Sequence, residues 1–227
     1  MTKVKSICVF CGASDGKDPR HMENAIAFGK MMAERGIALV YGGGRIGLMG
    51  AVADSVMQNG GEVIGIIPEH LHDIEVGHTG LSELIVCKSM HQRKVEMFRR
   101  SDAFVTLAGG LGSLDEAFEA MTLRQLGIHD KPMVFLNALG YWNKCLEMID
   151  GIIADGFARE SQHGRHDRQN REQLKSDAPA HQFLRGVGAA GAQKIVQAER
   201  EHDRDRGDRN RNQHPGQVFH DRWYRPS

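Results

Sequence analysis

The chain has 227 residues, of which 41% are hydrophobic and 26% are charged, a composition typical of a folded domain with a buried core. The 29 Lys and Arg residues equal the 29 Asp and Glu residues, which argues against a nucleic-acid-binding protein that relies on bulk positive charge. No apolar run approaches the length of a transmembrane helix, so no membrane partner is expected. The four scattered cysteines and the lack of a signal-like N-terminus favour a reduced, cytoplasmic setting.

The charge balance divides the sequence near residue 158. Residues 1–158 carry 15 basic and 19 acidic residues, whereas residues 159–227 carry 14 and 10, and only ten large apolar or aromatic residues. Such a segment buries too little apolar surface to offset its ordering entropy. We therefore expect one domain over 1–158 and a polar tail of low hydrophobicity over 159–227. The tail is expected to be disordered or, since its Arg/His/Gln-rich composition is typical of a shifted reading frame, not native sequence.

Short β-branched runs alternate with amphipathic stretches throughout residues 1–158. Strands separated by single helices indicate an α/β fold, a Rossmann-like, doubly wound parallel sheet with helices on both faces. In such sheets, ligands bind beyond the carboxyl ends of the strands, where the strand order reverses. In chain order, the pattern predicts strand Ser6–Cys11, helix Arg20–Glu34, strand Ala38–Tyr41, helix Leu48–Gln58, strands Val63–Ile67 and Glu83–Cys87, helix His91–Arg99, strand Ala103–Leu107, helix Leu114–Leu126, strand Met133–Leu136 and helix Tyr141–Asp155.

Two glycine-rich loops each run from a predicted strand into a predicted helix. The first reads YGGGRIGLMG over 41–50, and the second reads AGGLGSLDE over 108–116. Glycine lets the backbone approach a ligand closely, and the start of a helix offers free N–H groups and the positive end of the helix dipole. Both loops therefore predict contacts with a phosphate-bearing ligand.

The first loop also contains a formal G-x-G-x-x-G, formed by Gly42, Gly44 and Gly47. Glu69 follows about twenty residues later, as in a dinucleotide-binding site. However, this loop follows the second predicted strand rather than the first, and an NAD(P) site would leave the second loop without a role. We expect no bound cofactor.

Charged residues accompany both loops. Arg93 and Lys94 begin the helix after the fourth predicted strand, where an Arg can bind a phosphate or carboxylate with two hydrogen bonds, although the pair could equally form a solvated helix face. Asp115 and Glu116 are predicted in the first turn of the helix after the second loop, where acids often only complement the helix dipole. At the edge of a pocket, a carboxylate can instead activate water or stabilise a cation. Since adjacent helical residues point about 100° apart, only one of the two acids should face the ligand.

Two further patterns are expected to be structural. Cys8 and Cys11 form a C-x-x-C, but positions i and i+3 of a strand point to opposite faces, which argues against a redox or metal site. His70, His72 and His78 lie in one polar stretch without a nearby Cys, so we expect them to be solvated rather than metal ligands.

Together, these motifs resemble those of the LOG ("Lonely guy") family, the cytokinin riboside 5′-monophosphate phosphoribohydrolases, long labelled lysine decarboxylase-like. The family patterns YGGG-x-x-GLMG, MH-x-RK and PGG-x-GT-x-EE read here YGGGRIGLMG, MHQRK and AGGLGSLDE, and the similarity extends from Ser6 to Phe157. The chain departs from the family pattern at four positions: Ala108 stands in place of Pro, Leu111 in place of a common Tyr, Ser113 in place of Thr, and Asp115 in place of Glu. These departures put the substrate preference in question more than the reaction type.

The resemblance implies cleavage of the N-glycosidic bond of isopentenyl-AMP or AMP to the free base and ribose 5-phosphate, by a cytoplasmic homodimer of cytokinin biosynthesis that uses no metal or cofactor. It implies Arg93 and Glu116 as the catalytic pair. The sequence does not distinguish the two nucleotides. The implied substrate-binding residues are Glu75, Lys94, Gly109, Gly110, Leu111, Gly112, Ser113, Leu114, Asp115 and Thr122, beside the first-loop glycines Gly42, Gly43, Gly44 and Gly47.

Two alternatives use the same loops differently. A nucleotide or molybdenum-cofactor carrier of this fold would bind its ligand without turnover. A lysine decarboxylase would need pyridoxal phosphate on a lysine such as Lys94, and the sequence shows no separate pyridoxal site.

Overall fold

The computed structural model describes residues 4–72 and 77–158. Six strands form one parallel sheet in the order β4-β3-β2-β1-β5-β6, which confirms the predicted doubly wound architecture. Every predicted strand boundary lies within one residue of the observed one. The strands are β1 (Ser6–Phe10), β2 (Ala38–Tyr41), β3 (Val63–Pro68), β4 (Glu83–Cys87), β5 (Ala103–Thr106) and β6 (Met133–Phe135).

The helices depart from the prediction mainly in three places. A four-residue helix after Pro68 and a 3₁₀ turn before the last helix were not predicted. The helix after the second glycine loop begins at Leu111 instead of Leu114, so Asp115 and Glu116 lie in its second turn, not its first. The helices are α1 (Arg20–Glu34), α2 (Gly47–Gln58), α3 (Glu69–His72), α4 (Met90–Arg99), α5 (Leu111–Gln125), the 3₁₀ turn η1 (Ala138–Gly140) and α6 (Asn143–Ala154).

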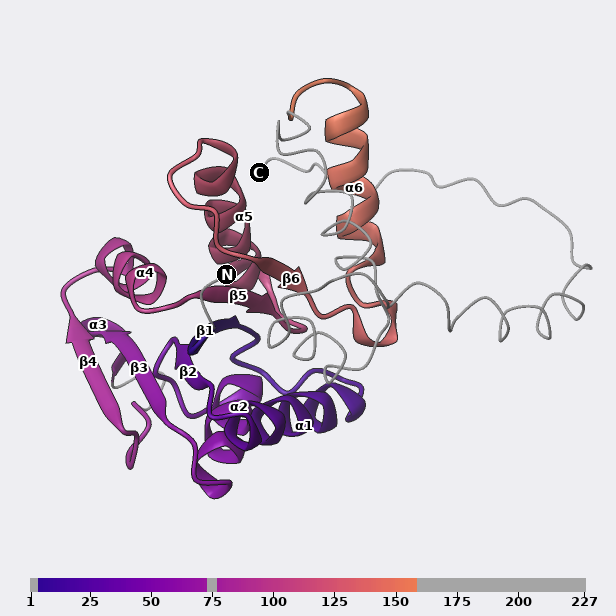
Figure 1. The fold of residues 1–227 in the computed structure, drawn as a ribbon. Helices are drawn as coiled ribbons and strands as arrows, with labels where there is room; N and C mark the ends of the chain where they lie inside the picture. Colours follow the sequence, from indigo (N-terminus) through magenta and orange to yellow (C-terminus); the bar gives the residue numbers. More distant parts are fainter. Residues whose placement is uncertain (1–3, 73–76, 159–227) are drawn as a thin grey trace, which may run out of the picture. The chain divides into compact units, whose positions relative to one another are not determined.

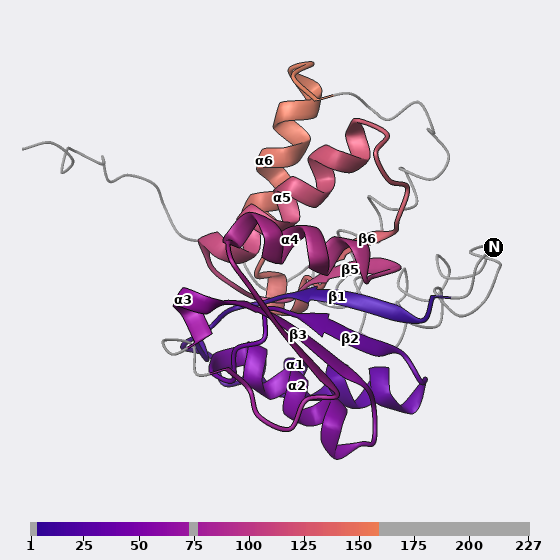
Figure 2. The same cartoon turned by 90° about the vertical axis from the view of Figure 1, so that its left-hand side faces the viewer.

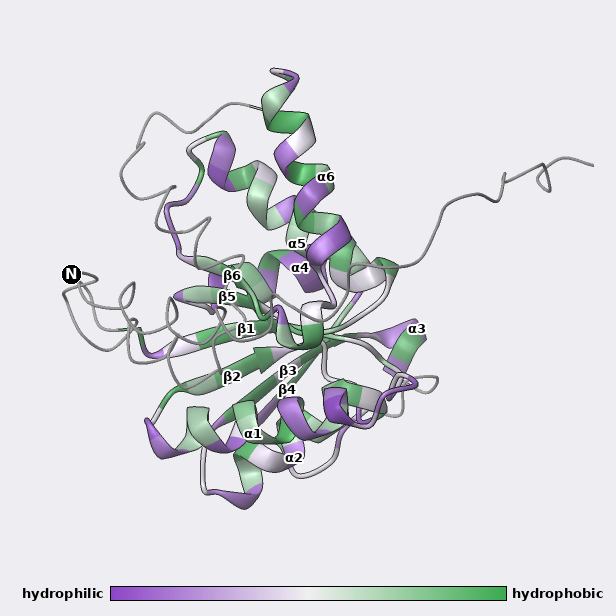
Figure 3. Ribbon diagram, turned by 90° about the vertical axis from the view of Figure 1, so that its right-hand side faces the viewer, coloured by the Kyte–Doolittle hydropathy of each residue, from purple (hydrophilic) through white to green (hydrophobic). Residues whose placement is uncertain are grey.

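The sheet separates two apolar cores (Figures 1 and 2). Helices α1 and α2 cover one face, and α4, α5 and α6 cover the other. Because side chains alternate along a strand, Cys11 joins the α1–α2 core and Cys8 the opposite one, as predicted for this C-x-x-C. The strands are largely hydrophobic, whereas polar residues lie along the helices (Figure 3).

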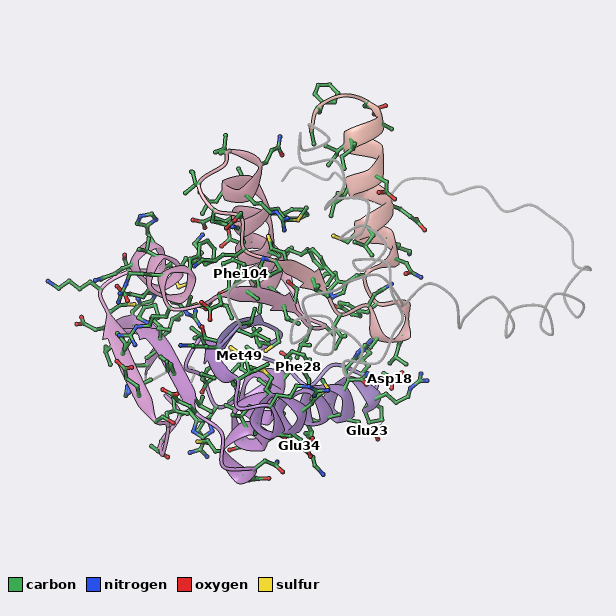
Figure 4. The ribbon with its side chains drawn as sticks, viewed as in Figure 1. Asp18, Glu23, Phe28, Glu34, Met49 and Phe104 are labelled. Carbon is green, nitrogen blue, oxygen red and sulfur yellow. The ribbon has the colours of Figure 1, made fainter. Side chains whose placement is uncertain are left out.

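Individual side chains show the same layering (Figure 4). Phe28 on α1 and Met49 on α2 pack in one core, while Phe104 on β5 packs in the other. Glu23 and Glu34 are exposed on α1. Burial on both faces of the strands accounts for their near-continuous apolar sequences.

The strand order reverses between β1 and β5. From β1 the chain builds the sheet outward through β2, β3 and β4, and then returns to the other side of β1 to add β5 and β6. The loops after β1 and β5 therefore flank the crevice where a doubly wound sheet binds ligands. Within residues 4–72 and 77–158, no helix is long and apolar enough to cross a membrane. The predicted tail over 159–227 lies outside the described residues.

Candidate active site

Both glycine loops lie at the same edge of the sheet, joined through the loop that follows β1. The Gly12 N–H donates to the Ala108 carbonyl over 3.0 Å, which ties this loop to the second glycine loop. The Gly12 carbonyl accepts from the Met49 N–H over 3.3 Å, which ties it to α2 and the first glycine loop. The structure thus brings the two motifs together at the switch point, although the first ends at Gly50 and the second begins at Ala108.

The first glycine loop holds Arg93. This side chain is only 5% exposed, and its guanidinium donates to the Gly42 carbonyl over 2.7 Å and to the Ile66 carbonyl over 3.1 Å. A Cβ at Gly42 would overlap the guanidinium, so glycine at this position makes room for the arginine. Arg93 therefore belongs to the buried edge of the sheet, and the alternative of a solvated helix face is wrong for this residue.

The remaining glycines of the first loop also pack against protein. The Gly43 carbonyl accepts from the His78 N–H over 2.9 Å, and Gly44 pairs with Gly77 in an isolated bridge. Gly47 has a positive φ of 61°, and a Cβ there would overlap the backbone after β1. A contact between these glycines and the substrate stays a prediction.

His78 corrects one sequence prediction. It was expected to be solvated, but it is only 8% exposed, and its Nε2 lies 3.0 Å from Asp54 Oδ1 on α2. Its Nδ1 lies 2.8 Å from the Thr79 carbonyl. The prediction failed because Asp54 lies 24 residues away in sequence, where no local pattern could reveal the contact.

The second glycine loop presents the start of α5. Gly110 is the residue before the helix, and Gly110, Leu111 and Gly112 are exposed. Ser113 is buried beneath the loop, where its side chain occupies the space that a Cβ at Gly109 would need. The first N–H groups of a helix have no partner within the helix, so this exposed end suits an anion.

The two acids of α5 have different surroundings. Asp115 is exposed and accepts a hydrogen bond from Lys94 Nζ over 3.0 Å. Glu116 is half-buried, and its charge acts on Cys11 at the end of β1. Burial is the main cause that raises the pKa of Cys11, the Glu116 carboxylate raises it further, and the Arg93 guanidinium lowers it. The Glu116 and Arg93 charges therefore act on the pKa of Cys11 in opposite directions.

Lys94 joins α4 to α5. Its ammonium forms ion pairs with Glu119 and Asp115, and the Lys94 side chain is 14% exposed. The hydrogen bond with Glu119, followed by that with Asp115, raises the pKa of Lys94. The basic pair is therefore divided: Arg93 points to the sheet edge, and Lys94 is held by two carboxylates of α5.

Two other predicted residues lie on α5, and a third lies outside the described residues. Leu114 is half-buried on α5. Thr122 is exposed on α5, six residues beyond Glu116 and so about 9 Å farther along the helix. Glu75 falls in 73–76, outside the described residues.

The structure adds Tyr141, which sequence reasoning missed. Its hydroxyl donates to the Gly109 carbonyl of the second glycine loop over 2.7 Å. Beside this loop lies a small cavity lined in part by His21, Asn24, Leu107 and Ala108. No local pattern links Tyr141 to a loop 32 residues earlier, and only its place after β6 at the same sheet edge could have suggested it.

Comparison with known proteins decides the family. The sequence model of a family described as "Possible lysine decarboxylase" matches residues 49–173. A cytokinin riboside 5′-monophosphate phosphoribohydrolase from Arabidopsis thaliana is 47% identical over 156 residues, which cover 69% of this chain and 72% of that protein. The chain belongs to the LOG family. A probable LOG enzyme from Oryza sativa subsp. japonica is 46% identical over 161 residues, covering 71% of this chain and 66% of the relative.

Solved structures support the fold of this LOG family member. A molybdenum-cofactor carrier protein from Chlamydomonas reinhardtii is 21% identical, with a TM-score of 0.53, over 66% of this chain and 84% of that one. At this identity, the likeness concerns the fold alone and does not favour the carrier alternative over the hydrolase.

Proposed function

We propose that the protein hydrolyses the N-glycosidic bond of a cytokinin riboside 5′-monophosphate, such as isopentenyl-AMP, or of AMP, releasing the free base and ribose 5-phosphate. LOG relatives nearly half identical in sequence are named for this activity. The observation that carries the proposal is the buried Arg93 guanidinium, held on the Gly42 and Ile66 carbonyls. Glu116 lies half-buried on α5, the helix whose exposed start suits a phosphate.

The second glycine loop and the start of α5 would anchor the 5′-phosphate. Glu116 lies five residues after the first residue of α5, about 7.5 Å along the helix. A nucleotide held by its phosphate would therefore extend its ribose toward Glu116. Binding energy from the phosphate, which does not react, then positions the bond that does.

Glycosidic cleavage builds positive charge on the ribose ring. The Glu116 carboxylate would stabilise that charge and orient a water, whose oxygen bonds to C1′ as the C1′–N electron pair leaves with the base. One proton of the water stays on the new C1′ hydroxyl, and the other passes to the nitrogen of the leaving base. A guanidinium donates hydrogen bonds and is not a proton-transfer group, so the part of Arg93 is to orient Glu116 and the substrate from its position on the Gly42 and Ile66 carbonyls.

Lys94 would act mainly by fastening α4 to α5, which keeps Arg93 and Glu116 together. For Lys94 to contact the phosphate as predicted, the phosphate must replace Asp115 or Glu119 as its partner. We also propose a cytoplasmic homodimer with no metal, cofactor, nucleic-acid or membrane partner; the balanced net charge supports the absence of a nucleic-acid partner.

Product analysis tests the proposal. Purified protein is incubated with AMP or isopentenyl-AMP, and free base and ribose 5-phosphate are separated by chromatography. Release from either nucleotide is expected, with loss of most turnover but not of nucleotide binding in Glu116→Gln. Glu147→Gln, the same change on the exposed side of α6, is the matched control and should turn over normally. Nucleotide binding without base release would support a carrier instead.

A further inference from the structure

Tyr141 holds the second glycine loop from outside the motif. Its hydroxyl donates to the Gly109 carbonyl over 2.7 Å. Its ring packs edge-on against His21 at 5.1 Å and against Trp142 at 4.8 Å between ring centroids. The ring contacts position the side chain, so the hydroxyl is the group that acts on the loop.

The turn that carries Tyr141 has a fixed geometry. Leu139 adopts a positive φ of 62°, the only such value among the described non-glycine residues. Buried Asn137 accepts from the Trp142 N–H over 2.7 Å and donates to Asn143 Oδ1 over 2.6 Å. A strained residue of this kind persists where the surrounding contacts over-determine the backbone, and such sites cluster near functional groups. This turn is therefore built to hold Tyr141 in one place.

The hydrogen bond from Tyr141 sets the orientation of the peptide that joins Gly109 to Gly110. The carbonyl of Gly109 and the N–H of Gly110 belong to one planar trans peptide, so they point in opposite directions. Because both residues are glycine, no side chain of their own restricts the rotation of this peptide. The bond from Tyr141 fixes the carbonyl and thereby fixes the direction of the Gly110 N–H, just before the exposed start of α5.

We propose that Tyr141 is a positioning residue of the phosphate site, which keeps the Gly109–Gly110 peptide oriented with its N–H toward the 5′-phosphate and its carbonyl away. The inference rests on the proposed function, since it places the phosphate of the substrate at the start of α5. With the peptide reversed, a carbonyl oxygen would face the anion and repel it.

Tyr141→Phe tests the proposal, because it removes the hydroxyl and keeps the ring contacts. The affinity for ribose 5-phosphate is measured by calorimetry. The turnover of AMP, and its inhibition by adenosine, are measured by chromatography of the released base. Loss of one hydrogen bond should raise the Kd of ribose 5-phosphate and the KM of AMP roughly threefold to tenfold. We expect kcat to change by less than about twofold, because the hydroxyl contacts neither the reacting bond nor the catalytic pair. The inhibition constant of adenosine, which has no phosphate, and the unfolding midpoint should not move.

Tyr41→Phe is the matched control. It makes the same change at a hydroxyl that is buried in the α1–α2 core and has no hydrogen-bond partner among the described residues. The Kd of ribose 5-phosphate should be unchanged in this variant.

Three outcomes would overturn the inference. The first is an unchanged Kd in Tyr141→Phe, and the second is an equal loss of affinity for adenosine together with a lower unfolding midpoint, which would indicate a merely structural role. The third is a wild-type protein that binds no ribose 5-phosphate. Because product binding does not require turnover, base release in the wild-type protein reports on the proposed function separately.

Discussion

Replacing Gly42 by alanine tests what the first glycine loop does. Gly42 has no positive φ, so the substitution adds a methyl group without straining the backbone. That methyl carbon would overlap the Arg93 guanidinium and lie 2.9 Å from its Cζ. The arginine must move, and it loses its 2.7 Å bond to the Gly42 carbonyl.

The cost follows from the burial of Arg93. A hydrogen bond to a charged group contributes about 1.5–3 kcal/mol, and a buried charge that loses its partner costs about 3–5 kcal/mol. Since part of the charge can find water at this edge, we expect the free energy of unfolding to fall by about 2–4 kcal/mol. Displacement of a catalytic group by about 1 Å should lower base release roughly a hundredfold.

Denaturant unfolding and single-turnover base release measure the two effects. Gly151→Ala is the matched control, because Gly151 lies within α6 with nothing near the added methyl group. That variant should gain roughly 0.5–1 kcal/mol from helix propensity and keep its turnover. Near-normal stability and turnover in Gly42→Ala would refute the idea that this loop positions Arg93.

Two further predictions concern the buried Tyr41 and the half-buried His129. Tyr41→Phe removes a buried hydroxyl that has no hydrogen-bond partner among the described residues, so it should raise the free energy of unfolding by about 1 kcal/mol in denaturant titration; a destabilised variant would contradict this. Burial lowers the pKa of His129 below its ordinary value near 6.5, so the native state binds a proton less readily than the unfolded chain. The free energy of unfolding is therefore highest above about pH 6.5, where His129 is neutral in both states, and it decreases as the pH falls below that value. Thermal unfolding between about pH 7 and pH 5 should show a steeper loss for the wild-type protein than for His129→Gln, and parallel curves would contradict the assignment.

The sequence predicted the fold closely because a strand buried on both faces has a distinctive composition. The predicted start of α5 was wrong because Gly112 and the exposed Leu111 resemble a loop, since glycine is a poor helix former. In the structure, these residues still form the first helical turn, above the buried Ser113. Glu116 consequently lies one turn deeper than expected.

The site was predictable where a motif carried it and unpredictable where a distant contact completed it. Arg93 and Glu116 were chosen from their motifs; the structure buries Arg93 on the first glycine loop and leaves Glu116 half-buried on α5, and their catalytic roles stay a prediction. Arg93 binds backbone carbonyls at the sheet edge, whereas Lys94 binds two carboxylates of α5. These contacts, and the bond from Tyr141 to Gly109, join elements that are remote in sequence. Periodicity and local motifs contain no information on such contacts.

A crystal structure of Glu116→Gln with bound AMP would test the central claim most directly. We expect the 5′-phosphate within hydrogen-bonding distance of the backbone N–H groups at 110–112, with the ribose between Arg93 and position 116. A phosphate bound instead in the first glycine loop, over Gly42–Gly47, would contradict the division of roles between the two loops and the catalytic assignment that follows from it.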